Sequence, residues 1–395
     1  MRRSLLLAVL ALSAFSACSV SGQVVSSRAA LLAADGSTVG EFHEGMTVSS
    51  ALAPEFFHVV SNLLTAEPAF GESPKDRQDY LLGGDISIET TIDVDMQLAA
   101  QSAIRSRIGP DERAAAVVIT LDIASGEVLA VASGGNVEGY PAGLPVAALV
   151  GRPTGSAFKP IALARAVEDG IDVEALYPAP ECVLVPNPTL TEVCGGTGTP
   201  MTLHNATVRS INTLFTGLMD ELGPQRVVDL AFDLGIRTSP LEPSTLAVLG
   251  LNPVTVLEMA SVYRTFAAGG EYLEPVLIRR VRGPDEEVLW EANPAPERVL
   301  TSQTAATITA VLTDVVLDGT GRGAQLDVSV AGKTGTSLNV TDAWFIGYTD
   351  RLITAVWVGI PDDPDRVLLP PATSERVVGS TWPTEIWRLL MSRIG

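Results

Sequence analysis

Two pairs of strand-like segments, one on each side of a long helix-rich stretch, constrain the fold of this chain more than any other feature. Residues 115–121 and 127–132 are apolar, β-branched runs joined by the turn sequence Asp-Ile-Ala-Ser-Gly. Residues 343–348 and 353–360 form the second pair, around a Thr-Asp-Arg turn. Residues 156–268, which separate the two pairs, have mainly helical patterns. This order predicts an α/β (α+β) chain, in which one sheet is assembled from both terminal portions and a helical subdomain is inserted between them.

A serine and a lysine lie three residues apart in the sequence Thr-Gly-Ser-Ala-Phe-Lys-Pro. If a helix begins at about Ser156, its hydroxyl and the Lys159 ammonium lie on one face, one turn apart. Pro160 cannot donate the helical hydrogen bond to the Ser156 carbonyl, so the serine is expected near the exposed start of that helix. A serine hydroxyl is a poor nucleophile until a neighbour accepts its proton, and a lysine with a lowered pKa can do so. Because Ser-x-x-Lys alone is a common pattern, the assignment needs partner motifs.

Two partner motifs follow downstream. They are Ser210-Ile211-Asn212, inside an expected helix over residues 204–221, and Lys333-Thr334-Gly335-Thr336, ahead of a strand-like run. Only three of the 26 basic residues are lysines, and two of these three fall inside the motifs. Taken singly, Ser-x-Asn is typical of a polar helix surface and Lys-Thr-Gly of a turn. Together and in this order, the three motifs are the set found in penicillin-binding proteins and serine β-lactamases.

On these motifs the sequence resembles the penicillin-binding transpeptidase domain, and it is more similar to that of the bifunctional class A proteins than to the monofunctional ones. The resemblance runs from Gly83 to Trp387 and includes four further stretches: Thr90–Asp93 with Gln97, Ser125–Ala130, Leu257–Ala260 and Asp342–Tyr348. It implies the penicillin-binding transpeptidase or serine β-lactamase-like fold, in which helices flank an antiparallel sheet and the active site lies in the cleft beside it. It implies no cofactor.

The resemblance also implies a role for each catalytic residue. Ser156 would attack the carbonyl between the two terminal D-alanines of a peptidoglycan stem peptide and form an acyl-enzyme. Lys159 would accept the serine proton, and Ser210 would relay a proton towards the leaving amine. Lys333 would attract the substrate carboxylate and help to keep Lys159 neutral, because two nearby cations lower each other's pKa.

The binding residues follow from the same resemblance. Asn212 would hydrogen-bond the substrate amide. Thr334 and Thr336, on either side of Gly335, would contact the substrate carboxylate. The backbone N–H groups of Ser156 and Thr336 would form the oxyanion hole.

The acyl-enzyme could be resolved in more than one way. The amine of a second stem peptide gives a D,D-transpeptidase, and water gives a D,D-carboxypeptidase with the same residues. A β-lactamase would need a deacylation base, and the candidates Glu221, Glu242 and Glu258 do not lie in a context that resembles its loop. A non-catalytic penicillin- or peptidoglycan-binding lipoprotein is a further alternative. The resemblance favours the transpeptidase, with β-lactams as covalent inhibitors.

The N-terminus has the pattern of an export signal. Two arginines precede an apolar run that is too short to span a bilayer, so we expect residues 1–17 to be a signal peptide. Cys18 then resembles the lipidated first residue of a bacterial lipoprotein, which would anchor the protein at the outer face of the cytoplasmic membrane. Simple cleavage that leaves a free Cys18 is the alternative. In either case the protein is expected in the cell envelope.

The charge and the remaining cysteines agree with export. A net charge of −20 repels nucleic acid, so no nucleic-acid partner is expected. Cys182 and Cys194 could close a small disulfide loop in an oxidising compartment, and two free thiols are the alternative. The three histidines are scattered, so we expect no metal cluster.

Residues 18–84 depart most from the class A pattern. Residues 33–39 look like the hairpin that precedes the glycosyltransferase domain of bifunctional relatives, and residues 52–57 and 66–70 echo the start of that domain. A catalytic domain needs on the order of 100 residues or more, and the segment is shorter. We therefore expect a spacer or a remnant here, with Glu67 non-catalytic.

Residues 85–395 are expected to be the transpeptidase domain. It would begin with a strand over residues 86–92 and an amphipathic helix over residues 94–107. By hypothesis, a transpeptidase that lacks its own polymerase acts beside a separate glycan polymerase.

Overall fold

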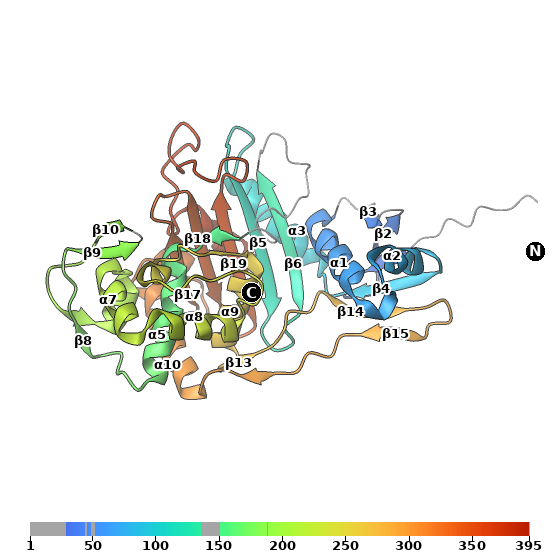
Figure 1. Cartoon of the computed structure of the whole chain (residues 1–395). Coiled ribbons are helices and arrows are strands. Elements are labelled where there is room, and N and C mark those ends of the chain that lie inside the picture. Colours follow the sequence, from blue (N-terminus) through green and yellow to red (C-terminus); the bar gives the residue numbers. More distant parts are fainter. Residues whose placement is uncertain (1–28, 44–45, 49–51, 136–150, 188, 395) are drawn as a thin grey trace, which may run out of the picture.

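The computed structural model describes residues 29–43, 46–48, 52–135, 151–187 and 189–394. The expected signal peptide, residues 1–17, and Cys18 lie outside the described residues, so both stay predictions. Figure 1 shows a larger unit built around a central sheet and, beside it, a smaller blue unit that two orange strands join. Within the described part, none of the helices is both long enough and apolar enough to cross a bilayer.

A five-stranded sheet forms the centre of the larger unit. Its order is β17 (Ala331–Thr336), β18 (Asp342–Tyr348), β19 (Leu352–Gly359), β5 (Ala115–Asp122) and β6 (Val128–Gly135). All neighbouring strands pair antiparallel. Strands β18 and β19 are buried along their whole length, which requires cover on both faces and explains their continuous apolar sequences. The prediction of a sheet assembled from both terminal portions is confirmed for these strands.

Helices supply that cover. The helical subdomain contains η3 (Gly155–Phe158), α5 (Lys159–Glu168), α6 (Leu203–Arg209), α7 (Asn212–Leu222), α8 (Pro224–Leu234), η4 (Thr245–Leu249) and α9 (Val256–Ala267), and is followed by α10 (Ser302–Leu317) and η5 (Arg322–Ala324). Among the described residues, this unit also contains α3 (Val94–Arg107) and α11 (Trp382–Ile394). Helix α3 has the predicted bounds.

Alternate residues of the central sheet face two different helical layers. Val118 and Val356 lie in one apolar cluster with residues of α3 and α11. Val117 and Trp357 lie in a second cluster with residues of α9. The two-residue period of a strand therefore divides the core into two layers. The predicted fold, an antiparallel sheet flanked by helices, is confirmed.

Three short strand pairs connect parts of the helical side. They are β7 (Arg152–Pro153) with β12 (Pro253–Val254), β8 (Leu176–Tyr177) with β11 (Met201–Thr202), and β13 (Glu271–Tyr272) with β16 (Glu297–Arg298). The first pair lies directly before the serine motif and fixes its point of entry.

The smaller unit has a sheet of its own. Its order is β15 (Val288–Glu291), β14 (Ile278–Arg282), β4 (Ile86–Thr90), β1 (Ala29–Leu32), β2 (Thr38–His43) and β3 (Thr47–Val48), accompanied by α1 (Pro54–Ala66), η2 (Pro68–Phe70) and α2 (Pro74–Leu82). Strand β4 pairs parallel to β1 and antiparallel to β14. The expected strand over residues 86–92 therefore joins this second sheet and not the central one. Most of the expected spacer is folded, and the division after residue 84 stays a prediction.

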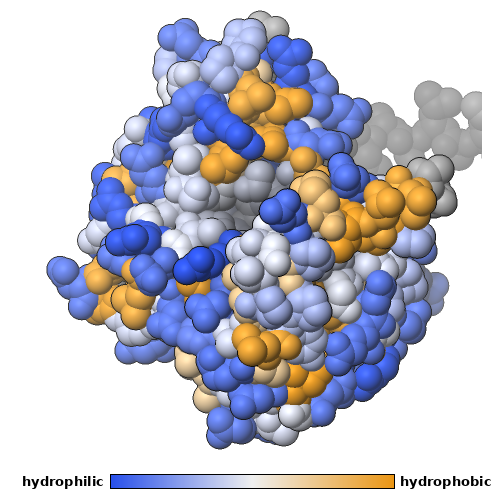
Figure 2. Space-filling model, turned by 90° about the vertical axis from the view of Figure 1, so that its left-hand side faces the viewer, coloured by the Kyte–Doolittle hydropathy of each residue, from blue (hydrophilic) through white to orange (hydrophobic). Residues whose placement is uncertain are grey.

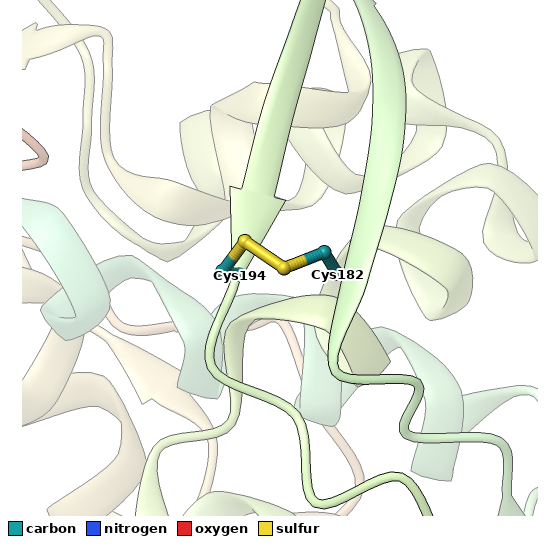
Figure 3. Close-up of a disulfide and its surroundings, with 2 residues drawn as sticks. All are labelled: Cys182 and Cys194. Carbon is teal, nitrogen blue, oxygen red and sulfur yellow. A yellow bond between two sulfur atoms is a disulfide. The ribbon is translucent and has the colours of Figure 1, made fainter.

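A disulfide closes the hairpin of β9 (Cys182–Asn187) and β10 (Thr189–Cys194). Cys182 and Cys194 are directly opposite in the strand register and are joined by their sulfur atoms, as Figure 3 shows. Val185 and Val193 are buried on the other face of the hairpin. The hairpin lies beside α7, at the far left of Figure 1.

Candidate active site

Ser156 lies in a 3₁₀ turn, η3, that leads directly into α5. We expected an α-helix to begin at Ser156, but α5 begins at Lys159, whose N–H donates to the Ser156 carbonyl and closes the turn. Pro160 lies in the first turn of α5, where its missing N–H costs nothing. The Ser156 side chain is partly exposed, whereas Lys159 is fully buried.

Two glycines let this turn touch strand β17 backbone to backbone. Gly155 has a φ of +57°, and a Cβ atom there would lie 2.3 Å from the Thr336 carbonyl oxygen. A Cβ on Gly335 would lie 2.2 Å from the Thr154 carbonyl oxygen. Both positions therefore require glycine. Ser156 and Thr336, the two residues expected to form the oxyanion hole, are held on adjoining segments.

A buried ion pair holds the segment that precedes the serine turn. The Arg152 Nε donates to Asp342 Oδ1 at 2.7 Å, and the two side chains are 7% and 1% exposed. The same carboxylate oxygen accepts from Trp357 Nε1 at 2.9 Å. The Trp344 indole donates to the Pro153 carbonyl at 2.8 Å. Strands β18 and β19 thus position the chain that leads into Ser156, a role that the sequence analysis did not assign to any of these residues.

Ser210 interrupts the helix that was expected over residues 204–221. The structure has two helices there, α6 and α7, and Ser210 ends α6 in the left-handed conformation at φ 59° and ψ 43°. The Ser210 N–H still donates to Thr207, and the Ile211 N–H to Ala206, which closes α6. A non-glycine residue in this conformation costs roughly 1 kcal/mol. The break turns the Ser210 carbonyl and hydroxyl towards Lys159.

The Lys159 ammonium is surrounded by oxygen atoms from the second motif. Its Nζ donates to the Ser210 carbonyl and to Asn212 Oδ1, each at 2.7 Å, and lies 3.3 Å from Ser210 Oγ. Burial lowers the pKa of Lys159 well below its ordinary value, and the charge of Lys333 lowers it further. Lys333 therefore lowers the pKa of Lys159, which is the predicted direction.

Lys333 approaches the same serine from strand β17. Its Nζ lies 2.9 Å from Ser210 Oγ and donates to the Thr334 carbonyl at 3.0 Å. Lys333 is fully buried, and burial lowers its pKa to about 7. One hydroxyl, Ser210 Oγ, therefore lies between two lysine amines whose pKa values are both lowered by burial.

The two threonines of the third motif have partners that the sequence analysis missed. Thr334 Oγ1 lies 2.6 Å from the Thr320 hydroxyl. Thr336 Oγ1 accepts from the Gly379 N–H at 3.0 Å, so its own proton stays available to a ligand. No motif marked Thr320 or Gly379, because both lie in loops far from Lys333 in sequence.

The motif residues meet at one cavity. It is lined by Ser156, Ser210, Asn212, Leu249, Thr336, Ser337, Leu338, Val340 and Arg376. Figure 2 shows the side of the molecule that carries β9 and β10, where a recess of intermediate hydropathy opens between hydrophilic rims and separate apolar patches. The structure therefore brings residues of all three motifs together. Lys159 and Lys333 do not line the cavity themselves but contact Ser210, which does. Arg376 is a lining residue that no motif contains.

The candidate glutamates lie elsewhere. Glu258 caps α9 and its carboxylate accepts from the Thr238, Ser239 and Thr255 backbone N–H groups. Glu221 accepts from a tyrosine, and Glu242 is joined through its backbone to Asn252. None of these three carboxylates lines the cavity.

One cluster in the described part of the chain has the spacing of metal ligands. It consists of Cys182, Glu192 and Cys194. Because its two sulfur atoms are joined in the disulfide, the cluster offers no thiolates to an ion.

The chain is similar to known proteins over most of its described length. A family profile described as "Penicillin binding protein transpeptidase domain" matches residues 116–365. Penicillin-binding protein 1A of Mycobacterium tuberculosis is 34% identical over 332 residues, which are 77% of this chain and 39% of that protein. Penicillin-binding protein 1A of Aquifex aeolicus is 32% identical over 65% of this chain and 35% of its own length. The chain thus spans well under half of these relatives.

A solved structure extends this similarity to the fold. The PonA1 protein of Mycobacterium tuberculosis, in complex with penicillin V, superposes with a TM-score of 0.68 at 30% sequence identity, over 78% of this chain and 85% of that one. Because the family profile covers more than half of the sequence and the same region holds the three motifs, the chain belongs to the penicillin-binding protein transpeptidase domain family.

Proposed function

We propose that this chain is a serine-type D,D-transpeptidase that cross-links peptidoglycan stem peptides through an acyl-enzyme on Ser156. The observation that carries the proposal is the meeting of two buried lysines at one hydroxyl beside a partly exposed serine. Ser210 Oγ lies 3.3 Å from Lys159 Nζ and 2.9 Å from Lys333 Nζ. The penicillin V complex of the similar PonA1 protein supports a β-lactam ligand.

Acylation would use the lone pair of a neutral Lys159. A neutral amine has two N–H donors, and the Ser210 carbonyl and Asn212 Oδ1, each 2.7 Å away, can accept both. The lone pair is then left for the Ser156 proton. Ser156 Oγ bonds to the carbonyl carbon of the penultimate D-alanine while its proton passes to Lys159 Nζ.

Ser210 would carry the proton to the leaving group. A hydroxyl between two amines can accept a hydrogen bond from one and donate to the other, so Ser210 can relay a proton between Lys159 and the leaving nitrogen. The carbon–nitrogen bond breaks, D-alanine departs, and the acyl group stays as an ester on Ser156. The amine of a second stem peptide then attacks the ester and forms the cross-link.

Substrate binding would use residues of the second and third motifs. Lys333 and the hydroxyls of Thr334 and Thr336 bind the terminal carboxylate, and the Asn212 side chain binds the substrate amide. The backbone N–H groups of Ser156 and Thr336, held close by Gly155 and Gly335, stabilise the oxyanion.

The test is a product analysis with a stem peptide ending in D-Ala-D-Ala and a second peptide that carries a free amine. A transpeptidase forms the amide between them and releases D-alanine, and a Ser156→Ala variant forms neither. Only the hydrolysed peptide would identify a D,D-carboxypeptidase instead. A penicillin adduct without any peptide product would indicate a binding protein without turnover.

We also propose that the protein acts in the cell envelope, anchored by a lipid on Cys18, beside a separate glycan polymerase. Membrane fractionation of the wild type and of Cys18→Ser tests the anchor, because only the wild type should stay with the membrane. Chemical cross-linking in cells that recovers no cell-wall polymerase would count against the partner.

A further inference from the structure

One arginine gives the active-site cavity a positive charge in an acidic protein. Among the nine described residues that line it, Arg376 is the one with a charged side chain, and none has a carboxylate. Lys159 and Lys333 lie directly behind Ser210. The chain as a whole has a net charge of −20. Such a local field attracts anionic ligands to the cavity, although the rest of the surface repels them.

Arg376 is not neutralised by its neighbours. Glu375, the adjacent residue, forms an ion pair with Arg107 and accepts from Trp382 Nε1 at 2.6 Å. Within the described ranges, Arg376 itself has no ion pair and no side-chain hydrogen bond, and it is exposed. Its guanidinium is therefore free to bind an anion.

The loop that carries Arg376 is attached to the carboxylate-binding end of β17. The Gly379 N–H donates to Thr336 Oγ1 at 3.0 Å, and the Leu368 N–H donates to the Val340 carbonyl at 2.8 Å. These two bonds hold the loop on both sides of Arg376. Arg376 therefore lies in the lining of the cavity together with Thr336, one of the residues assigned to the terminal carboxylate.

We propose that Arg376 is a specificity-determining residue that binds a second carboxylate of the acyl donor. The preferred substrates would be dianionic acyl donors, which carry a side-chain carboxylate near the reacting carbonyl in addition to the terminal one. A guanidinium suits this task because its planar N–H groups match the two oxygens of a carboxylate. The inference rests on the proposed function, since it concerns the same acylation reaction.

The experiment compares two penicillins that differ by one carboxylate. Benzylpenicillin and carbenicillin have the same nucleus and terminal carboxylate, and only carbenicillin has a carboxylate on its side chain. The second-order rate constant of acylation is measured for the wild type, Arg376→Ala and Arg376→Lys. The matched control is Arg351→Ala, which removes one charge from the β18–β19 turn at the opposite end of the sheet, about 20 Å away.

In Arg376→Ala we expect carbenicillin to react about three- to tenfold more slowly, while benzylpenicillin changes less than twofold. Arg376→Lys should keep part of the rate, and Arg351→Ala should keep all of it for both drugs. The difference should shrink at high salt, because the guanidinium is exposed.

Equal slowing of both penicillins in Arg376→Ala would overturn the inference, because Arg376 would then act on the carboxylate that they share. Unchanged rates for both would overturn it as well. If the wild type reacts with neither drug, the proposed function fails first and this inference with it. If benzylpenicillin acylates every variant, the acylation reaction is intact, and the carbenicillin rates alone test the role of Arg376.

Discussion

Replacing Asp342 with asparagine tests whether the buried ion pair positions the segment that leads into Ser156. The two carboxylate oxygens accept from Arg152 Nε at 2.7 Å, from Trp357 Nε1 at 2.9 Å and from Thr341 Oγ1 at 2.7 Å. Asparagine keeps the size but loses the charge, so the Arg152 guanidinium is left buried and uncompensated. Removing one partner of a buried pair costs about 3–5 kcal/mol. Because asparagine can still accept one hydrogen bond, we expect a loss of about 3 kcal/mol in the free energy of unfolding.

The assay is urea unfolding of wild type, Asp342→Asn, Arg152→Met and the double variant Arg152→Met/Asp342→Leu. The double variant should be more stable than Asp342→Asn, because apolar residues can replace both charges together. Acylation by a fluorescent penicillin should fall about tenfold in Asp342→Asn at a temperature where the variant is folded, because the chain leading into Ser156 shifts. A stability within about 0.5 kcal/mol of wild type and an unchanged acylation rate would show that the ion pair neither stabilises the fold nor positions Ser156.

Three further predictions follow from the same geometry. Burial lowers the pKa of Lys333 to about 7, so between about pH 7 and about pH 10 the folded chain binds fewer protons than the unfolded one. The stability of wild type relative to Lys333→Met, measured by urea unfolding, should therefore rise with pH over this range and stay constant below it. A difference that falls with pH would be incompatible with a lowered pKa of Lys333. Replacing both Cys182 and Cys194 by alanine should lower the free energy of unfolding by about 3 kcal/mol, as expected for loss of a disulfide that closes a short loop. If dithiothreitol destabilises the double variant as much as wild type, the loss of stability does not come from the disulfide. Gly155→Ala should reduce the rate of penicillin acylation more than about 100-fold, because the positive φ is strained for alanine and the added Cβ clashes with the Thr336 backbone. A rate near that of wild type would show that the close contact with β17 is not needed for acylation.

The central sheet and the three motifs could be predicted because their signals are local. Apolar runs with short turns mark the hairpins β5–β6 and β18–β19, and their two-sided burial follows from the absence of polar alternation. Ser156 and Lys159 are close in sequence, so their proximity needs only one turn of backbone. The third motif could be joined to them through the family resemblance, which supplies long-range information that periodicity lacks.

The parts that could not be predicted depend on contacts between distant residues. The break at Ser210 leaves the apolar pattern of the helices around it intact, so periodicity favours one helix over residues 204–221. Arg152 and Asp342 are 190 residues apart, and nothing local indicates that they pair. Strand β4 was recognised as a strand, but its partners β1 and β14 lie on opposite sides of it in the chain.

Intact-protein mass spectrometry after incubation with a penicillin tests whether Ser156 forms the acyl-enzyme. The purified chain is followed over hours beside Ser156→Ala. The control is Ser337→Ala, since this serine lines the same cavity but has no assigned role in acylation. We expect one persistent adduct, with the mass of the intact drug, on wild type and Ser337→Ala, and none on Ser156→Ala. An adduct of the same mass on Ser156→Ala would contradict the assignment of Ser156 as the nucleophile. Rapid loss of the wild-type adduct, with turnover of the drug, would identify a β-lactamase instead.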